Sequence, residues 1–229
     1  MRLVVFIIVS LLLLAPQVAG ATVIATWDDP ADGLDGWDAS GTGTWIEYSA
    51  TGGNSGGYIK IGGNRTIGFK NTTADFTGNY ASRGFNGASF DMMVLLQQLP
   101  AYKPSLVFRY SPSYNGWEYV LNDFTIENAG TWQHFDIQFD PLWSDAEAVA
   151  NGWAPVDTYM LKPFSETLTH VDAFTIFSDY PSNVAKVLGL DNVMLNGNAA
   201  VPEPVSSSLF IMGAIGMGLS RIRKKRAQK

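Results

Sequence analysis

The chain has 229 residues, no cysteine, 46% hydrophobic residues and a formal net charge of −6. This length suits one domain with a sizeable core, and the lack of cysteine excludes a disulfide-stabilised scaffold. The charge is uneven, because residues 22–198 hold 20 acidic and 8 basic residues and therefore have a net charge of −12. A strongly acidic domain repels phosphate backbones, which argues against nucleic acid as a partner.

The first 21 residues have the pattern of a secretory signal peptide. Arg2 supplies a positive charge, and residues 3–15 are apolar apart from one serine. Ala19, Gly20 and Ala21 then supply the small residues that a signal peptidase needs. We expect cleavage after Ala21, with Gly20 as the near alternative. The other interpretation is an uncleaved anchor helix, but the apolar run is short for a span of roughly 20 residues.

The central residues, 22–198, alternate short apolar runs with turn-forming residues. Several runs are rich in β-branched and aromatic residues and alternate with a period of two, which is typical of strands. The expected strands are 23–27, 44–48, 57–61, 87–94, 105–110, 117–121, 132–139, 171–177 and 190–195. The pattern predicts an all-β protein, an antiparallel β-sandwich. One helix is expected, at 145–150 or at 163–168 with Ser165 as its N-cap.

The tail, residues 199–229, combines three features in a fixed order. Pro202-Glu203-Pro204 is a rigid, extended tripeptide, because proline restricts both itself and its predecessor. The apolar stretch 205–219 follows, and as a helix it would be about 22 Å long, short of a hydrocarbon core of about 30 Å. The chain ends in a basic cluster that includes Arg221, Arg223, Lys224, Lys225 and Arg226. Such a cluster stays cytoplasmic, so the preceding domain is expected outside.

This tail resembles the PEP-CTERM sorting signal over residues 201–229. The resemblance implies processing by exosortase, a membrane enzyme of Gram-negative bacteria that make exopolysaccharide and biofilm matrix. Exosortase would cut near Pro202-Glu203-Pro204. The protein would then be exported, anchored transiently in the inner membrane by its C-terminal helix, and finally located at the cell surface or in the extracellular matrix. The alternative is a plain C-terminal membrane anchor.

The central domain resembles the laminin B (domain IV) type of galactose-binding-like jelly roll over residues 24–196. The residues that carry the resemblance are Gly36-Trp37, the glycine-rich turn 52–57, segment 76–80 before strand 87–91, strand 132–139, segment 164–171 and the final strand 190–195. The resemblance implies a jelly-roll fold and an adhesion-like setting, and it implies no catalytic site.

A calcium site is a further implication of this resemblance. Jelly rolls of this type often hold a structural Ca²⁺ between the first and last strands, and Asp28, Asp29 and Asp191 match those positions. Asn54 and Gly57 in the glycine-rich turn would add oxygens towards the six to eight that calcium takes. The alternative is that Asp191 caps a turn and that the first two carboxylates belong to a solvated loop.

Aromatic residues are abundant, with seven Trp and nine Tyr. Aromatic faces stack on pyranose rings, and neighbouring polar side chains bind the hydroxyl groups. The candidate ligand-binding residues are Tyr114, Trp117, Trp143 and Trp153. Trp45 and Trp132 lie in strands with period-two patterns and are expected in the core. The alternative is that most of these aromatic residues fill the core.

No catalytic motif stands out from the sequence. His134 and His170 lack metal-binding spacing, and there is neither a Gly-x-Ser-x-Gly elbow nor a cysteine nucleophile. Twenty acidic residues form accidental pairs, so carboxylates alone do not identify a glycosidase. We expect a non-catalytic binding or adhesion module for exopolysaccharide or other matrix glycans. The alternatives are a purely structural matrix protein and a polysaccharide-active enzyme.

Overall fold

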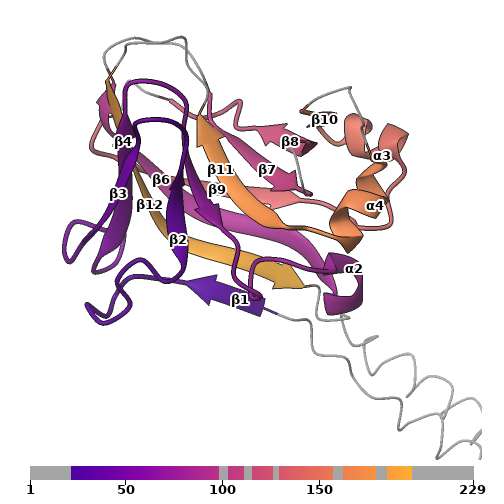
Figure 1. The fold of residues 1–229 in the computed structure, drawn as a ribbon, viewed down its shortest axis with the longest axis horizontal. Coiled ribbons are helices and arrows are strands. Elements are labelled where there is room, and N and C mark those ends of the chain that lie inside the picture. Colours follow the sequence, from indigo (N-terminus) through magenta and orange to yellow (C-terminus); the bar gives the residue numbers. More distant parts are fainter. Residues whose placement is uncertain are drawn as a thin grey trace, which may run out of the picture. The chain divides into compact units, whose positions relative to one another are not determined.

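The computed structural model describes residues 22–97, 103–110, 115–125, 129–156, 162–178 and 185–197. These residues form two antiparallel sheets and a few short helices (Figure 1). The predicted all-β fold, a β-sandwich of the jelly-roll type, is therefore confirmed. No helix in the described ranges is both long and apolar enough to cross a membrane. The expected signal peptide, the sorting tail and Tyr114 lie outside the described residues.

The first sheet, which we call sheet A, has the strand order β3-β4-β12-β6-β9, and β1 also pairs with β12. Its strands are β1 (Thr22–Ala25), β3 (Trp45–Ser49), β4 (Tyr58–Gly63), β6 (Phe85–Gln97), β9 (Trp132–Gln138) and β12 (Lys186–Gly197). The last strand of the chain therefore lies in the middle of this sheet, between β6 on one side and β4 and β1 on the other.

The second sheet, sheet B, has the strand order β10-β8-β7-β11-β5-β2. Its strands are β2 (Trp37–Ser40), β5 (Ile67–Asn71), β7 (Ser105–Arg109), β8 (Gly116–Val120), β10 (Trp153–Pro155) and β11 (Ala173–Ser178). The sequence did not predict β2, β5 or β10, because each is short and contains polar residues, a glycine or a proline. Their ladder partners in the sheet supply the backbone hydrogen bonds that local propensity does not predict.

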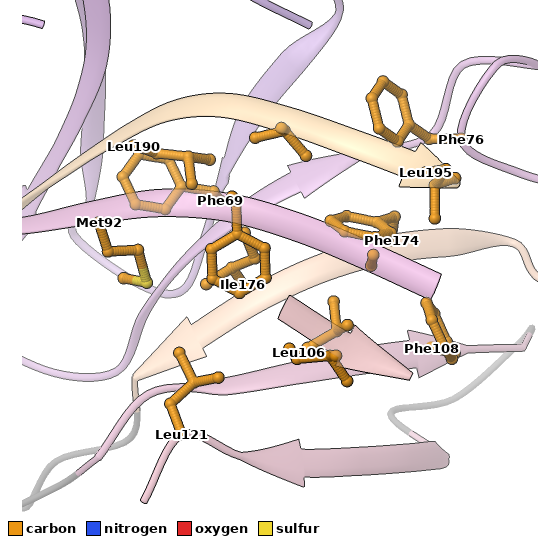
Figure 2. Close-up of a cluster of buried hydrophobic side chains, with 14 of the residues drawn as sticks. Phe69, Phe76, Met92, Leu106, Phe108, Leu121, Phe174, Ile176, Leu190 and Leu195 are labelled. Carbon is orange, nitrogen blue, oxygen red and sulfur yellow. The ribbon is translucent and has the colours of Figure 1, made fainter. Parts of the chain in front are cut away.

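The core lies between the two sheets and is formed by alternate side chains of their strands. Met92 and Leu190 of sheet A lie opposite Leu106, Phe69 and Ile176 of sheet B (Figure 2). Each of these side chains is at most 1% exposed, which is typical of a close-packed interior. Fully burying one such side chain contributes about 1.5–3 kcal/mol, so a core of this kind holds the fold without disulfides.

Three short helices complete the domain: α2 (Tyr80–Arg83), α3 (Asp145–Ala150) and α4 (Phe164–Thr169). The sequence predicted one helix at either of two places, and both places are helical. A capping box explains the start of α3, because Ser144 and Glu147 each accept a hydrogen bond from the other's backbone N–H. The N-cap of α4 is Pro163, so the prediction of Ser165 as N-cap is wrong.

Candidate functional site

Side chains on the outer face of sheet A form the candidate site. A strand turns alternate residues to opposite faces, and Ile46, Phe135 and Ile137 pack towards the core. Their neighbours along β3 and β9 therefore point outward, and the register places residues of β4, β12 and β6 beside them. We define the outer face by Trp45, Glu47, Tyr58, Lys60, Asp91, Trp132, His134 and Asp136.

Three aromatic rings lie on this face above a floor of glycines. The indole of Trp45 lies directly over Gly62, where a Cβ atom would collide with the ring. A Cβ on Gly189 would lie 3.1 Å from Trp132 and 3.2 Å from Tyr58. The rings of Tyr58 and Trp132 are 5.4 Å apart and nearly perpendicular. Trp45 is 43% exposed, so this ring is open to a partner.

An ion pair lies beside the aromatic rings. Lys60 Nζ lies 2.6 Å from Glu47 Oε1, on directly opposed residues of neighbouring strands. The hydrogen bond to Glu47 raises the pKa of Lys60. Both side chains are partly exposed, so the pair stabilises the fold little. Its contribution to the site is to place a donor and an acceptor next to the rings.

Asp191 attaches the glycine-rich turn to the last strand. Its side chain is completely buried and accepts N–H hydrogen bonds from Asn54 (2.8 Å), Ser55 (3.3 Å) and Asn192 (2.8 Å). Burial raises the pKa of Asp191 and the charge of Asp91 adds to this, while the three N–H groups act in the opposite direction. The turn lies near Trp132, whose indole N–H donates to the Gly52 carbonyl at 3.2 Å.

Asp91 lies directly across from Asp191 in the sheet and is 3% exposed. One carboxylate oxygen accepts from the side-chain amides of Asn54 (2.8 Å) and Asn192 (2.7 Å). The other lies 2.7 Å from His134 Nδ1. A carboxylate only accepts, so Nδ1 carries the hydrogen of this bond. The His134 side chain is 65% exposed, so Asp91 orients an accessible imidazole.

A cavity of about 210 Å³ lies at the free edge of β9, next to His134. It is smaller than the roughly 300–1,000 Å³ of pockets for drug-sized ligands, so it has room for one small unit. One wall comes from β8 and the loop that follows it, and the other from β9. The lining residues are Tyr119, Leu121, Asn122, Asp123, Gln133, His134, Phe135, Asp136 and Ile137. We call this cavity the β9-edge pocket.

The residues predicted to bind calcium are only partly brought together. Asp191 and Asn54 are in contact, Gly57 closes the same turn, and Asp28 lies beside Gly56. Asp29 is exposed and accepts from the N–H of Ala31. The oxygens of Asp191 face N–H donors, which a cation does not coordinate, and within the described ranges no group of three or more carboxylate or histidine side chains could hold a metal ion. The calcium site stays a prediction from the sequence.

The predictions that Trp117 and Trp153 bind a ligand are wrong, because each side chain is only 1% exposed and cannot contact one. Trp117 packs against Phe164 of α4, and Trp153 stacks on Phe108 in the core. Their indole N–H groups donate to backbone carbonyls, so burial leaves no polar atom without a partner. Trp143 is half-buried and stacks on Phe164 near the same end of the domain.

The opposite error concerns Trp45 and Trp132, which were expected in the core and lie on the outer face. A signal for this placement exists in the sequence. Trp45 has the same strand parity as Glu47, and Trp132 has the same parity as His134 and Asp136. The apolar residues of both strands occupy the other parity, so the charged members of each strand indicate which face is outside.

The comparisons with known proteins concern the fold. No family model and no curated protein sequence matches the chain. A family 11 carbohydrate-binding module from Clostridium thermocellum, in complex with a β-1,3-1,4-mixed-linked tetrasaccharide, is 14% identical, with a TM-score of 0.49 over 77% of this chain and 95% of that chain. A family 29 carbohydrate-binding module is 15% identical, with a TM-score of 0.42, covering 81% and 97%. The L4b domain of human laminin alpha-2 is 7% identical, with a TM-score of 0.38, covering 60% and 79%. Each is a β-sandwich to which this chain is similar in fold alone.

Proposed function

We propose that the β-sandwich is a non-catalytic carbohydrate-binding module and that the outer face of sheet A is its binding surface. The observation that supports this most strongly is the pair of tryptophan rings, Trp45 and Trp132, which lie over Gly62 and Gly189 on the outer face, with Tyr58 buried beside Trp132. Sugar rings stack on aromatic side chains, and donors and acceptors beside the rings bind their hydroxyl groups. Lys60 and Glu47 supply such groups next to Trp45.

Among the residues that the structure describes, the carboxyl groups favour binding over catalysis. A glycosidase needs a carboxylic acid with a raised pKa in contact with the scissile bond. The pKa is raised for Asp35, chiefly by burial, and for Asp191. Asp191 is completely buried under its three N–H donors, and Asp35 lies in the loop before β2, a strand of sheet B. Neither belongs to the open part of the outer face.

The test is calorimetry with soluble oligosaccharides, including those of the host's own exopolysaccharide. Trp45→Ala and Trp132→Ala should each weaken binding by about 30-fold, because central aromatic residues of an interface typically contribute about 2 kcal/mol. Trp143→Ala removes an indole outside the face and should leave affinity unchanged. Melting curves should show that all three variants remain folded. Lack of binding to every glycan tested would contradict the proposal and favour a purely structural matrix protein.

Export and sorting are a second part of the proposal and rest on the sequence alone. We infer that the signal peptide, 1–21, is removed and that exosortase cuts near Pro202-Glu203-Pro204, so that the module reaches the cell surface or the extracellular matrix after a transient stay in the inner membrane. Mass spectrometry of the mature protein from its host tests this. A chain that still ends at Lys229 would indicate plain anchoring.

Calcium binding also remains a proposal from the sequence. The test compares melting temperatures in EDTA and in millimolar Ca²⁺, because an ion that binds only the folded state raises the melting temperature by mass action. An unchanged melting temperature would contradict calcium binding. The three N–H hydrogen bonds to Asp191 would then be what holds the glycine-rich turn in place.

A further inference from the structure

We propose that the β9-edge pocket binds the protonated amino group of an amino-sugar unit, so that the module prefers glycans with free amines. This inference deepens the proposed function and rests on it, since the outer face holds the glycan and the pocket selects one of its units. The observation that supports this inference is the β9-edge pocket itself. It has room for one sugar unit, and its hydrogen-bonding groups are predominantly acceptors.

Two carboxylates, Asp123 and Asp136, line the pocket, and no lysine or arginine does. Both residues are exposed. Asp136 accepts one hydrogen bond, at 2.9 Å, from the Gln138 side chain. The ion pairs found among the described residues involve neither carboxylate. The pocket therefore holds negative charge without a basic side chain to balance it.

The other polar side chains of the pocket offer few free donors. The Asp91 carboxylate accepts the Nδ1 hydrogen of His134, so this donor is not available to a ligand. The Gln133 amide is already used by Thr125, because it accepts from the backbone N–H and the hydroxyl of Thr125 and donates to its carbonyl. Asn122 adds one amide that both donates and accepts.

An ammonium group fits this arrangement better than a hydroxyl or an acetamide. It has three donors and no acceptor, and its hydrogen bonds to carboxylates are roughly twice as strong as neutral ones. An N-acetyl group has no charge, a single N–H and a carbonyl that would face other acceptors. The net charge of −12 on residues 22–198 attracts cationic glycans from a distance.

The position of the pocket connects it to the stacking surface. His134 belongs both to the pocket and to the outer face, and it lies two residues along β9 from Trp132. Two residues of a strand span about 7 Å, so a sugar stacked on Trp132 has its neighbouring unit at the pocket. Tyr119 and Leu121 form an apolar wall for that unit's ring.

The experiment compares glucosamine oligomers with N-acetylglucosamine oligomers of the same length, by calorimetry on the full domain below pH 7. We expect the free-amine oligomers to bind at least about tenfold more tightly. The double variant Asp123→Asn/Asp136→Asn should abolish this preference by weakening the binding of the free-amine oligomers. The control Asp32→Asn/Asp75→Asn removes the same charge from exposed carboxylates outside the pocket and should keep the preference.

The outcomes separate this inference from the proposed function. Equal affinity for both oligomers, or an equal loss in the control variant, would overturn the amino-sugar inference. If another glycan still bound through Trp45 and Trp132, the carbohydrate-binding proposal would stand. If no glycan bound at all, both would fail.

Discussion

At the residue scale, the side chain of Asp91 has two roles. It accepts from two asparagine amides that anchor the glycine-rich turn and the last strand, and it orients His134. The first role concerns stability and the second concerns the chemistry of the face. The two roles use different carboxylate oxygens. Replacing Asp91 removes both roles and replacing His134 removes only the second, so comparing the two variants separates them.

Asp91→Ala should lower the free energy of unfolding by about 1–3 kcal/mol, because the partly buried amide of Asn192 loses its acceptor, whereas the exposed Asn54 can bond to water instead. His134→Ala removes a largely exposed ring and should change the free energy of unfolding by no more than about 0.5 kcal/mol. Urea unfolding measures both. Equal losses of stability in the two variants would show that the imidazole is structural.

The buried carboxyl of Asp191 predicts a pH dependence. Its pKa is raised in the folded state, so between its unfolded value near 3.9 and its folded value the native protein binds more protons than the unfolded chain. The contribution of this group to stability is therefore largest at acidic pH and declines as the pH rises through the folded pKa. Relative to Asp191→Asn, the native protein should lose stability in thermal melts as the pH rises from the unfolded value, near 3.9, through the folded pKa. A relative gain over that range would contradict the assignment.

At the element scale, the glycines of β4 and β12 make the aromatic surface. Gly62 and Gly189 have no side chains on the outer face, so Trp45, Tyr58 and Trp132 lie close to the sheet. β3, β9 and β4 itself supply the rings, and the glycines of β4 and β12 supply the space. The arrangement depends on the register of five strands, β3, β4, β12, β6 and β9, and on no single local motif.

Gly62→Ala should displace the Trp45 ring and weaken glycan binding by about tenfold or more, while the melting temperature changes little because the ring is partly exposed and can move away. Gly87→Ala is a matched control in β6, where a Cβ would first meet Gln138 at 3.4 Å. It should leave binding unchanged. Equal affinities for the two variants in calorimetry would show that the ring over Gly62 does not contact the glycan.

Element by element, the sequence predicts the long strands better than the shortest ones. β6, β9 and β12 have 13, 7 and 12 residues, but the three-residue β10 depends on pairing with β8, which no local pattern reveals. The candidate site was harder to predict. Two of the three tryptophans assigned to it, Trp117 and Trp153, are buried, and the two assigned to the core are on the face, because aromatic identity alone does not distinguish the two sides of a strand.

At the scale of the whole molecule, the acidic charge should select among polysaccharides. Residues 22–198 have a net charge of −12, so polymers of uronic acid are repelled and neutral or amino polymers are not. We expect no retardation of the protein in native gels that contain a polyuronate at low salt. Retardation that disappears as salt is added would contradict this, because screening would then be removing an attraction.

The central place of β12 determines when the domain can fold during synthesis. The ribosome makes this strand last within the domain, yet it pairs with β1, β4 and β6, and its Asp191 holds a turn that lies 137 residues earlier in the chain. Until residues 186–197 emerge, those earlier strands have no central partner, and contacts that distant form slowly. Under the proposed export, a translocase that needs an unfolded polypeptide would therefore have nearly the whole of translation in which to engage this chain.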